Sequence, residues 1–303
     1  MTTNRSAILA LAAAGALWGL TVPLSKLSLD WLGGAWLTVI RFAIAAPVLA
    51  YAGRRGLRAA LTPRIAAAGA IGFGAVILLQ NAGIERTSVS HAALVVGAVP
   101  VMVALMAAAL GQGVARPVTW AGYGLALAGI AMVAGGGGSG ASTAGDLLVF
   151  ASVALSATFI VAQPRLLAGR DPAAVTAVQF AAGALVALPH ALAFEGLPPA
   201  PAQAAPVVAL VALALAGTLL PFWLFAYGQA HVPAGLAGTF LNLEPLVGVA
   251  VGWVGFGEAV AANQLLGGVA VLAGIALSTF RPKEGRRPRS GRPRAWRPVI
   301  STG

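Results

Sequence analysis

The chain has 303 residues, of which 59% are hydrophobic and only 9% are charged, and its mean hydropathy is +0.88. Soluble domains carry about 25% charged residues, so this composition excludes an ordinary soluble domain and indicates a protein folded in lipid. The absence of cysteine excludes disulfides and thiolate metal sites. The net charge of +11 would suit nucleic acid, but the positions of the charges favour another explanation.

Apolar runs of roughly 18–25 residues follow one another along the chain, and each is long enough to cross a hydrocarbon core about 30 Å thick as a helix. Charged or turn-forming stretches separate them, such as GRRGLRAALTPR at 53–64. The first run follows MTTNRS and is interpreted as a retained helix rather than a signal peptide, because nine more runs follow. The ten expected transmembrane helices lie at 7–26, 34–52, 64–84, 89–110, 118–135, 146–164, 173–195, 205–230, 235–255 and 262–280.

The basic residues are distributed asymmetrically between the two sides of this expected bundle. With the N-terminus in the cytoplasm, every Lys and Arg falls on the cytoplasmic side except Lys26, Arg41 and Arg86. Cytoplasmic loops carry an excess of Lys and Arg, so we expect a protein of the cytoplasmic (inner) membrane with both termini in the cytoplasm. The basic tail at 281–303 is interpreted as a solvated anchor on anionic lipid rather than a nucleic-acid site.

The pentapeptide LAGIA occurs at 127–131 and again at 272–276, which is 145 residues further on. The same shift places Gly83 on Gly228, and it aligns the third to fifth expected helices with the eighth to tenth. The first and sixth helices align with a shift nearer 138 residues. Small residues in and around both copies of LAGIA share one helix face, which allows close packing of backbones in lipid.

An internal repeat of five helices has a consequence for topology, because five is odd and the second copy must enter the membrane from the opposite side. Inverted repeats of this kind are a recurring design of transporters. We therefore expect an all-α integral membrane fold with ten transmembrane helices, arranged as two inverted five-helix repeats around a central cavity. The expected units are a first repeat at 1–135, a Gly- and Ser-rich connector at 136–145, a second repeat at 146–280 and the basic tail at 281–303.

Several segments in this order resemble the drug/metabolite transporter superfamily, and specifically its ten-span EamA-type members. The resemblance is carried by ALWGLTVPLSK (16–26), the pair Arg41–Phe42, QNAGIERTSVSHAALVVGAVP (80–100), GYGLALAGIAM (122–132), GD (145–146), FAYGQAHVPAGLAGTFLNLEP (225–245), GFGE (255–258) and GGVAVLAGIAL (267–277). Each motif is weak alone, whereas their duplicated order is specific and extends to about Arg281.

The resemblance implies a cavity between the two halves, alternating access, and export of metabolites or drugs by a monomer or a homodimer. The chain departs from the family pattern at two places. Gly111-Gln112 stands where Gly-Glu is frequent, which weakens any role for a carboxylate in that loop. Ser156 stands near the position of a frequent Trp, which changes the wall of the cavity.

Two charged residues, Arg41 and Glu244, lie inside expected membrane helices. A charge in the bilayer core costs several kcal/mol, so it usually faces protein or a water-filled cavity and often has a function. Glu244 precedes Pro245, which removes a helix hydrogen bond and can bend the helix. One interpretation makes Glu244 a proton acceptor or the partner of a substrate amine, and Arg41 a site for a substrate carboxylate. The other pairs Arg41 with Glu244 as a structural ion pair.

Other polar and aromatic residues lie deep enough in the expected helices to line a cavity. Lipid-facing packing is the main alternative for Trp223, and a water-exposed position at a helix start is expected for His91. The expected cavity residues are Trp18, Thr21, Arg41, Gln80, Asn81, Ser156, Phe159, Gln163, Trp223, Tyr227, Asn242 and Glu244.

An intramembrane enzyme and an open channel are the rival classes. The sequence contains no H-E-x-x-H, no G-x-S-x-G and only three histidines, so it offers no catalytic constellation, and neither a metal nor a cofactor is expected. A channel is disfavoured by the inverted repeat but not excluded by it. We predict a secondary transporter of small metabolites, either amino acids or similar amphipathic molecules, with drugs as a further possibility. Glu244 is its expected proton-coupling residue.

Overall fold

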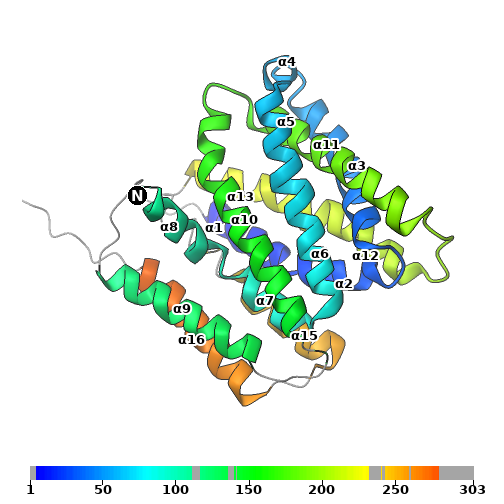
Figure 1. Cartoon of the computed structure of the whole chain (residues 1–303). Coiled ribbons are helices and arrows are strands. Elements are labelled where there is room, and N and C mark those ends of the chain that lie inside the picture. The colour runs from blue at the N-terminus through cyan, green and yellow to red at the C-terminus, as the bar shows by residue number, and fades with distance from the viewer. Residues whose placement is uncertain are drawn as a thin grey trace, which may run out of the picture.

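The computed structural model describes residues 5–110, 117–135, 140, 142–231, 240, 243–258 and 261–279, and every regular element within them is a helix (Figure 1). This confirms the all-α prediction. The elements are α1 (Arg5–Gly19), α2 (Thr21–Leu29), α3 (Gly34–Ala52), α4 (Leu57–Ala60), α5 (Pro63–Gly69), η1 (Ala70–Ala75), α6 (Val76–Arg86), α7 (Val89–Val96), α8 (Val99–Ala109), α9 (Pro117–Gly135), α10 (Thr143–Leu167), α11 (Pro172–His190), η2 (Ala191–Glu195), α12 (Ala204–Ala214), η3 (Leu215–Leu219), α13 (Leu220–His231), α15 (Leu243–Phe256) and α16 (Ala262–Thr279).

Six helical segments in the described part of the chain are long and apolar enough to cross a membrane. They are Arg5–Leu29, Gly34–Ala52, Pro63–Arg86, Thr143–Gln163, Pro172–Glu195 and Ala204–Phe225. The four remaining apolar runs also contain helices, namely α7 with α8, α9, α15 and α16. The protein is therefore a multi-pass membrane protein. Half of the expected connector and all of the basic tail lie outside the described residues, and α10 begins at Thr143.

Two helices on one side of the expected bundle begin at a polar cap followed by proline. Thr62 accepts a hydrogen bond at its Oγ1 from the N–H of Ile65, and Pro63 is the first residue of α5. Asp171 does the same for the N–H groups of Ala173 and Ala174 at the start of α11. A capping oxygen satisfies a free helix N–H, and proline at the first position lacks the N–H that would be unsatisfied. These local signals fix where the two helices begin.

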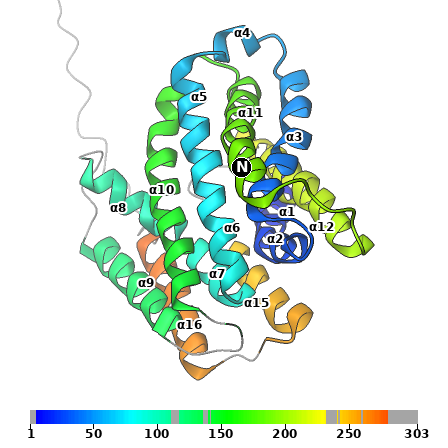
Figure 2. The same cartoon turned by 45° about the vertical axis from the view of Figure 1, so that its right-hand side comes forward.

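The two copies of LAGIA pack against each other, since α9 and α16 lie side by side in both views (Figures 1 and 2). A Cβ on Gly129 would lie 2.6 Å from the carbonyl oxygen of Gly267, and a Cβ on Gly274 would lie 2.5 Å from that of Gly122. The expected close backbone packing is thus confirmed. The two contacts are equivalent, because Gly122 and Gly267 are related by the same shift as Gly129 and Gly274.

Two further close contacts are related in the same way. Gly83 of α6 packs against Val149 of α10, and Gly228 of α13 packs against Leu11 of α1. Gly83 and Gly228 are equivalent under the shift of 145 residues, and Leu11 and Val149 under the shift of 138. Each segment thus packs its third helix against the first helix of the other segment.

The π-helices η1 and η3 interrupt α-helical structure at equivalent positions, because Ala70 and Leu215 are 145 residues apart. Their middle glycines also make equivalent contacts. A Cβ on Gly72 would meet the ring of Phe159, and a Cβ on Gly217 would lie 3.3 Å from the methyl group of Thr21. A π turn shifts the direction of the side chains that follow it and is frequent at functional sites.

Candidate functional site

A cavity of about 380 Å³ lies among helices from both segments and is lined mainly by apolar and aromatic side chains. Both π-helices contribute to it, through Gly72 and Phe73 of η1 and through Gly217 and Thr218 of η3. Cavities of this size that are mostly apolar, with a few polar groups, are the usual form of small-molecule sites.

Nine of the residues expected from the sequence line this cavity. They are Trp18, Thr21, Arg41, Gln80, Asn81, Ser156, Phe159, Gln163 and Glu244. Trp223 and Tyr227 do not line it. The Trp223 side chain is 69% exposed on the surface of the helix bundle, and the Tyr227 hydroxyl lies 3.2 Å from the hydroxyl of Ser6. Asn242 lies outside the described residues.

Arg41 is the basic group of the cavity wall. It projects from the middle of α3, and its Nε donates a 2.8 Å hydrogen bond to the hydroxyl of Thr218. That hydroxyl in turn donates to the carbonyl of Leu213, five residues back, a bond that the π-helix makes available. The guanidinium also lies 5.6 Å from the ring centroid of Phe42. Its orientation is therefore fixed through Nε, and within the described part of the chain its two terminal amino groups donate no hydrogen bond.

Glu244 is the acidic group of the cavity wall, and it lies in the first turn of α15. A carboxylate is favoured there because the N-terminal end of a helix carries partial positive charge. Pro245 also lies in this first turn, where the missing N–H costs little. The ion pair considered from the sequence is not formed, since Arg41 and Glu244, both described, are not paired. One cavity therefore presents a guanidinium and a carboxylate that do not neutralise each other directly.

The aromatic part of the wall is a connected cluster. Phe42 stacks on Phe180 with ring centroids 4.6 Å apart, and Phe73 meets Phe42, Phe159 and Phe180 edge to face at 5.8, 5.1 and 4.7 Å. Sequence reasoning identified Phe159 but missed Phe73, Phe180 and Thr218. Phe73 and Thr218 occupy equivalent positions under the shift of 145 residues, so a signal for one would have indicated the other.

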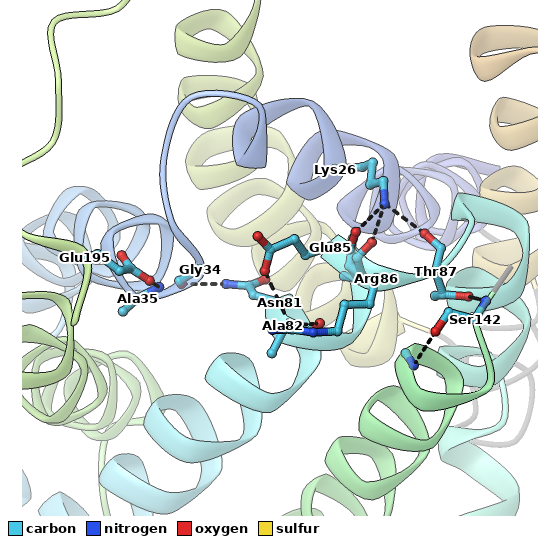
Figure 3. Close-up of polar contacts among 12 residues, drawn as sticks. Lys26, Gly34, Ala35, Asn81, Ala82, Glu85, Arg86, Thr87, Ser142 and Glu195 are labelled. Atoms are coloured by element: carbon cyan, nitrogen blue, oxygen red, sulfur yellow. Dashed lines mark hydrogen bonds and ion pairs between the residues drawn. The ribbon is translucent and has the colours of Figure 1, made fainter. Parts of the chain in front are cut away.

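Amide side chains complete the polar lining, and two of them are already engaged. Asn81 donates from Nδ2 to the carbonyl of Gly34 at 3.0 Å (Figure 3). It also donates to the hydroxyl of Thr38 at 3.1 Å, and the two bonds tie α6 to α3. Gln163 and Gln179 exchange two hydrogen bonds of 3.0 and 2.9 Å between α10 and α11. Their principal contribution is to hold helices together around the cavity.

His91 is not at the water-exposed position that the sequence suggested, and that expectation is wrong. Its side chain is fully buried, and its Nδ1 lies 2.8 Å from a carboxylate oxygen of Asp146. The other oxygen of Asp146 accepts a 2.6 Å hydrogen bond from Thr87. The start of α10 covers the start of α7, which a reading of the α7 sequence alone could not anticipate. In the described part of the chain, no cluster of His, Asp and Glu could hold a metal ion.

A cavity enclosed by apolar, membrane-spanning helices from two equivalent segments is the architecture of a membrane transporter. The chain belongs to the EamA-like transporter family, whose model matches it twice, over residues 5–135 and 143–280. The family resemblance drawn from the sequence is thereby confirmed, including membership of the drug/metabolite transporter superfamily. This places the protein among transporters of small molecules.

Similar proteins carry transporter names. A "Probable terminal-alkyne amino-acid exporter" of Streptantibioticus cattleyicolor is 30% identical over 90% of this chain and 93% of its own length. An "Uncharacterized transporter" of Archaeoglobus fulgidus is 25% identical over 92% of this chain and 99% of its own length. A solved crystal structure with 23% identity superposes with a TM-score of 0.66, covering 91% of this chain and 97% of the other, and so shares the fold.

Proposed function

We propose that the protein is a secondary transporter that exports amino acids, or similar small amphipathic carboxylates, across the cytoplasmic membrane by alternating access. The observation that carries this proposal is that the guanidinium of Arg41 and the carboxylate of Glu244 line one aromatic cavity without pairing with each other. A molecule with a carboxylate, an amine and an apolar remainder matches each of these surfaces.

Arg41 is suited to hold the carboxylate. A guanidinium presents its N–H groups in a planar fork that matches the two oxygens of a carboxylate. The bond from Nε to Thr218 fixes the plane of that fork and leaves the terminal amino groups for a ligand. The rings of Phe42, Phe73 and Phe180 then offer an apolar surface beside it.

Glu244 is suited to hold an amine or a proton. A buried carboxylate without a cationic partner favours either protonation or binding of a cation. In this proposal a proton from the outside competes with the substrate amine for Glu244. Binding of one therefore releases the other, which couples export to proton entry.

Alternating access is supported by the equivalent contacts of the two segments. Ten spans in two inverted five-helix units explain why third helices pack on first helices across the segments and why η1 matches η3. Two similar units can exchange roles to open the same cavity to either side. The distribution of Lys and Arg favours cytoplasmic termini, and the name of the Streptantibioticus relative favours export.

The test is transport by the purified protein in proteoliposomes, with a panel of radiolabelled amino acids and their decarboxylated and esterified analogues. We expect uptake of zwitterions that a proton gradient accelerates, and weaker uptake of the analogues. Uptake at equal rates with and without the gradient, and without counterflow, indicates an uncoupled facilitator and contradicts the proposal.

A further inference from the structure

The turn between α6 and α7, formed by Thr87 and Ser88, is held from both sides by side chains of other helices. It lies at the end of the bundle where α2 ends and α3 begins, an end that the proposed topology places outside the cell. Lys26 of α2 contacts the α6 side of this turn, and Glu258, which follows α15, contacts the α7 side. We refer to Lys26 and Glu258 on this turn as the clasp.

Lys26 binds the carbonyl end of α6. Its ammonium donates to the carbonyls of Ile84, Glu85 and Thr87 at 2.7, 3.0 and 2.8 Å, and Figure 3 shows it directed at this helix end. The C-terminal end of a helix has unsatisfied carbonyls and partial negative charge, so a cation there is stabilising. The three donors of one ammonium group are thereby all used.

Glu258 binds the amide end of α7. Its two oxygens accept hydrogen bonds from the N–H groups of Val89 and Ser90, the second at 2.9 Å. Gly257, which directly follows α15, has a φ of 63° and turns the chain toward α7. The N–H of Glu258 then donates a hydrogen bond to the carbonyl of Gly252. A carboxylate is the matching charge for a helix N-terminus. The two charges of the clasp thus complement the two helix ends that meet at the turn.

The clasp joins the turn to elements from elsewhere in the chain. α2, which carries Lys26, packs mainly against α12, and α15, which precedes Glu258, packs against both α1 and α7, whereas α6 and α7 pack against α10. α15 also approaches α7 closely at this end, since a Cβ on Gly252 would lie 2.5 Å from the Ser90 hydroxyl and 3.1 Å from its backbone nitrogen. When the cavity opens at this end by movement of α2 and of the end of α15 away from the turn, every bond of the clasp breaks.

The repeat does not reproduce the two charges of the clasp. The shift of 138 residues places Pro164 at the position equivalent to Lys26, and the Gly-Glu pair at 257–258 corresponds to Gly111-Gln112. Neither Pro164 nor Gln112 carries a charge.

We infer that the Lys26–Glu258 clasp belongs to the outer gate of the transporter. Its bonds stabilise the state in which the cavity is closed to the outside. The inference rests on the alternating access of the proposed function. Loss of either charge removes the bonds at one helix end and shifts the population toward the state open to the outside. The cavity then becomes reachable from that side without any substrate.

Thiol labelling measures this directly, because the chain has no cysteine and one introduced cysteine is its sole thiol. Gln80 lines the cavity from α6, and Gln80→Cys serves as the reporter. The full-length protein in right-side-out and inverted vesicles is treated with a membrane-impermeant maleimide. Adding Lys26→Gln or Glu258→Gln is expected to raise the labelling rate from the clasp side roughly tenfold, given the strength of charged hydrogen bonds, and Lys26→Arg is expected to keep it slow.

Two controls make the result specific. Arg86→Gln removes an exposed cation from the last residue of α6, outside the clasp, and is expected to leave the rate unchanged. Glu85→Cys, at a half-exposed position beside the turn, marks the side of the membrane on which the clasp lies. Size-exclusion chromatography of each variant establishes that it is folded.

The proposal is overturned if both Gln variants are folded and label at the parental rate, or if Arg86→Gln accelerates labelling equally. Loss of folding in both Gln variants also overturns it, since the clasp is then needed for assembly rather than gating. If one of them fails to fold, the other decides. Labelling needs no substrate, so a failure to transport amino acids contradicts the proposed function and leaves this measurement valid.

Discussion

Arg41 and Glu244 line the same cavity from α3 and α15, yet they do not form an ion pair. Two opposite charges in a membrane protein usually invite pairing, because a buried charge without a partner is costly. Here Arg41 is held by a hydroxyl instead, and both charges line the mostly apolar cavity. The arrangement keeps both groups available to a ligand.

The first prediction concerns the energetic independence of these two charges. Arg41→Ala and Glu244→Ala should each change the melting temperature in detergent, and the double variant should show the sum of the two effects. Because the two side chains share no hydrogen bond or ion pair, we expect their coupling to fall below the roughly 0.5–3 kcal/mol of residues in contact. Thermal unfolding of the four proteins of this double-mutant cycle measures the coupling. A rescue of stability in the double variant would show that the ion pair forms in solution.

The second prediction concerns Thr218. Thr218→Val keeps the shape of the side chain but removes the hydroxyl that fixes Arg41. Loss of this hydrogen bond to a charged group costs about 1.5–3 kcal/mol, so the KM for carboxylated substrates should rise at least about tenfold with little change for decarboxylated analogues. Thr218→Ser, which retains the hydroxyl, is the matched control and should transport normally. Equal KM changes for both substrate classes would assign Thr218 a packing role.

The third prediction concerns Glu244. Glu244→Gln retains size and polarity but loses the charge that holds the substrate amine and cannot take up a proton, so the variant should bind substrate more weakly and lose the acceleration by a proton gradient. Counterflow, which needs no net proton movement, should persist. The measurement is uptake into proteoliposomes across a range of external pH, with and without the gradient. Gradient-driven uptake at the parental rate would remove Glu244 from the coupling mechanism.

The fourth prediction concerns the contact of α9 with α16. Gly129→Val and Gly274→Val place atoms where the backbone of the facing helix lies, and such overpacking costs about 1–3 kcal/mol. Both should therefore lower the melting temperature by similar amounts, because the two contacts are equivalent. Gly124→Ala is the matched control in α9, since a Cβ there meets nothing within 4 Å. A destabilisation as large in the control would mean that α9 tolerates no added side chain anywhere.

The fifth prediction concerns topology. Reporter fusions after residue 140 should lie outside the cell and fusions after Arg58 in the cytoplasm, because five spans separate the N-terminus from the first site in the proposed arrangement. Alkaline phosphatase and fluorescent protein fusions measure the two locations. The same location for both sites would contradict the inverted repeat.

The sequence predicted the helices and much of the cavity lining, because hydrophobic runs and in-span polar residues report directly on the lipid environment. Nine expected residues line the cavity, including Arg41 and Glu244. The sequence could not predict the hydrogen-bond partners of those residues. The hydroxyl that holds Arg41 lies 177 residues away, and the burial of His91 depends on Asp146 in another helix. Trp223 was expected in the cavity only because of its depth along the expected helix. Depth does not tell which face of a helix meets lipid.

The matching positions of η1 and η3 bear on how such a chain arises. If the two segments matched by the family model descend from one ancestral gene, the π turn already existed before the gene was duplicated. In the proposed inverted arrangement, the ancestral product was then a five-helix subunit that assembled as an antiparallel dimer, and every group in its cavity occurred twice. Fusion into one chain removed that constraint: Gln179, equivalent to Arg41 under the shift of 138, and Val99, equivalent to Glu244 under the shift of 145, are both neutral. After this divergence the two halves of the cavity present different groups to the two ends of an asymmetric ligand.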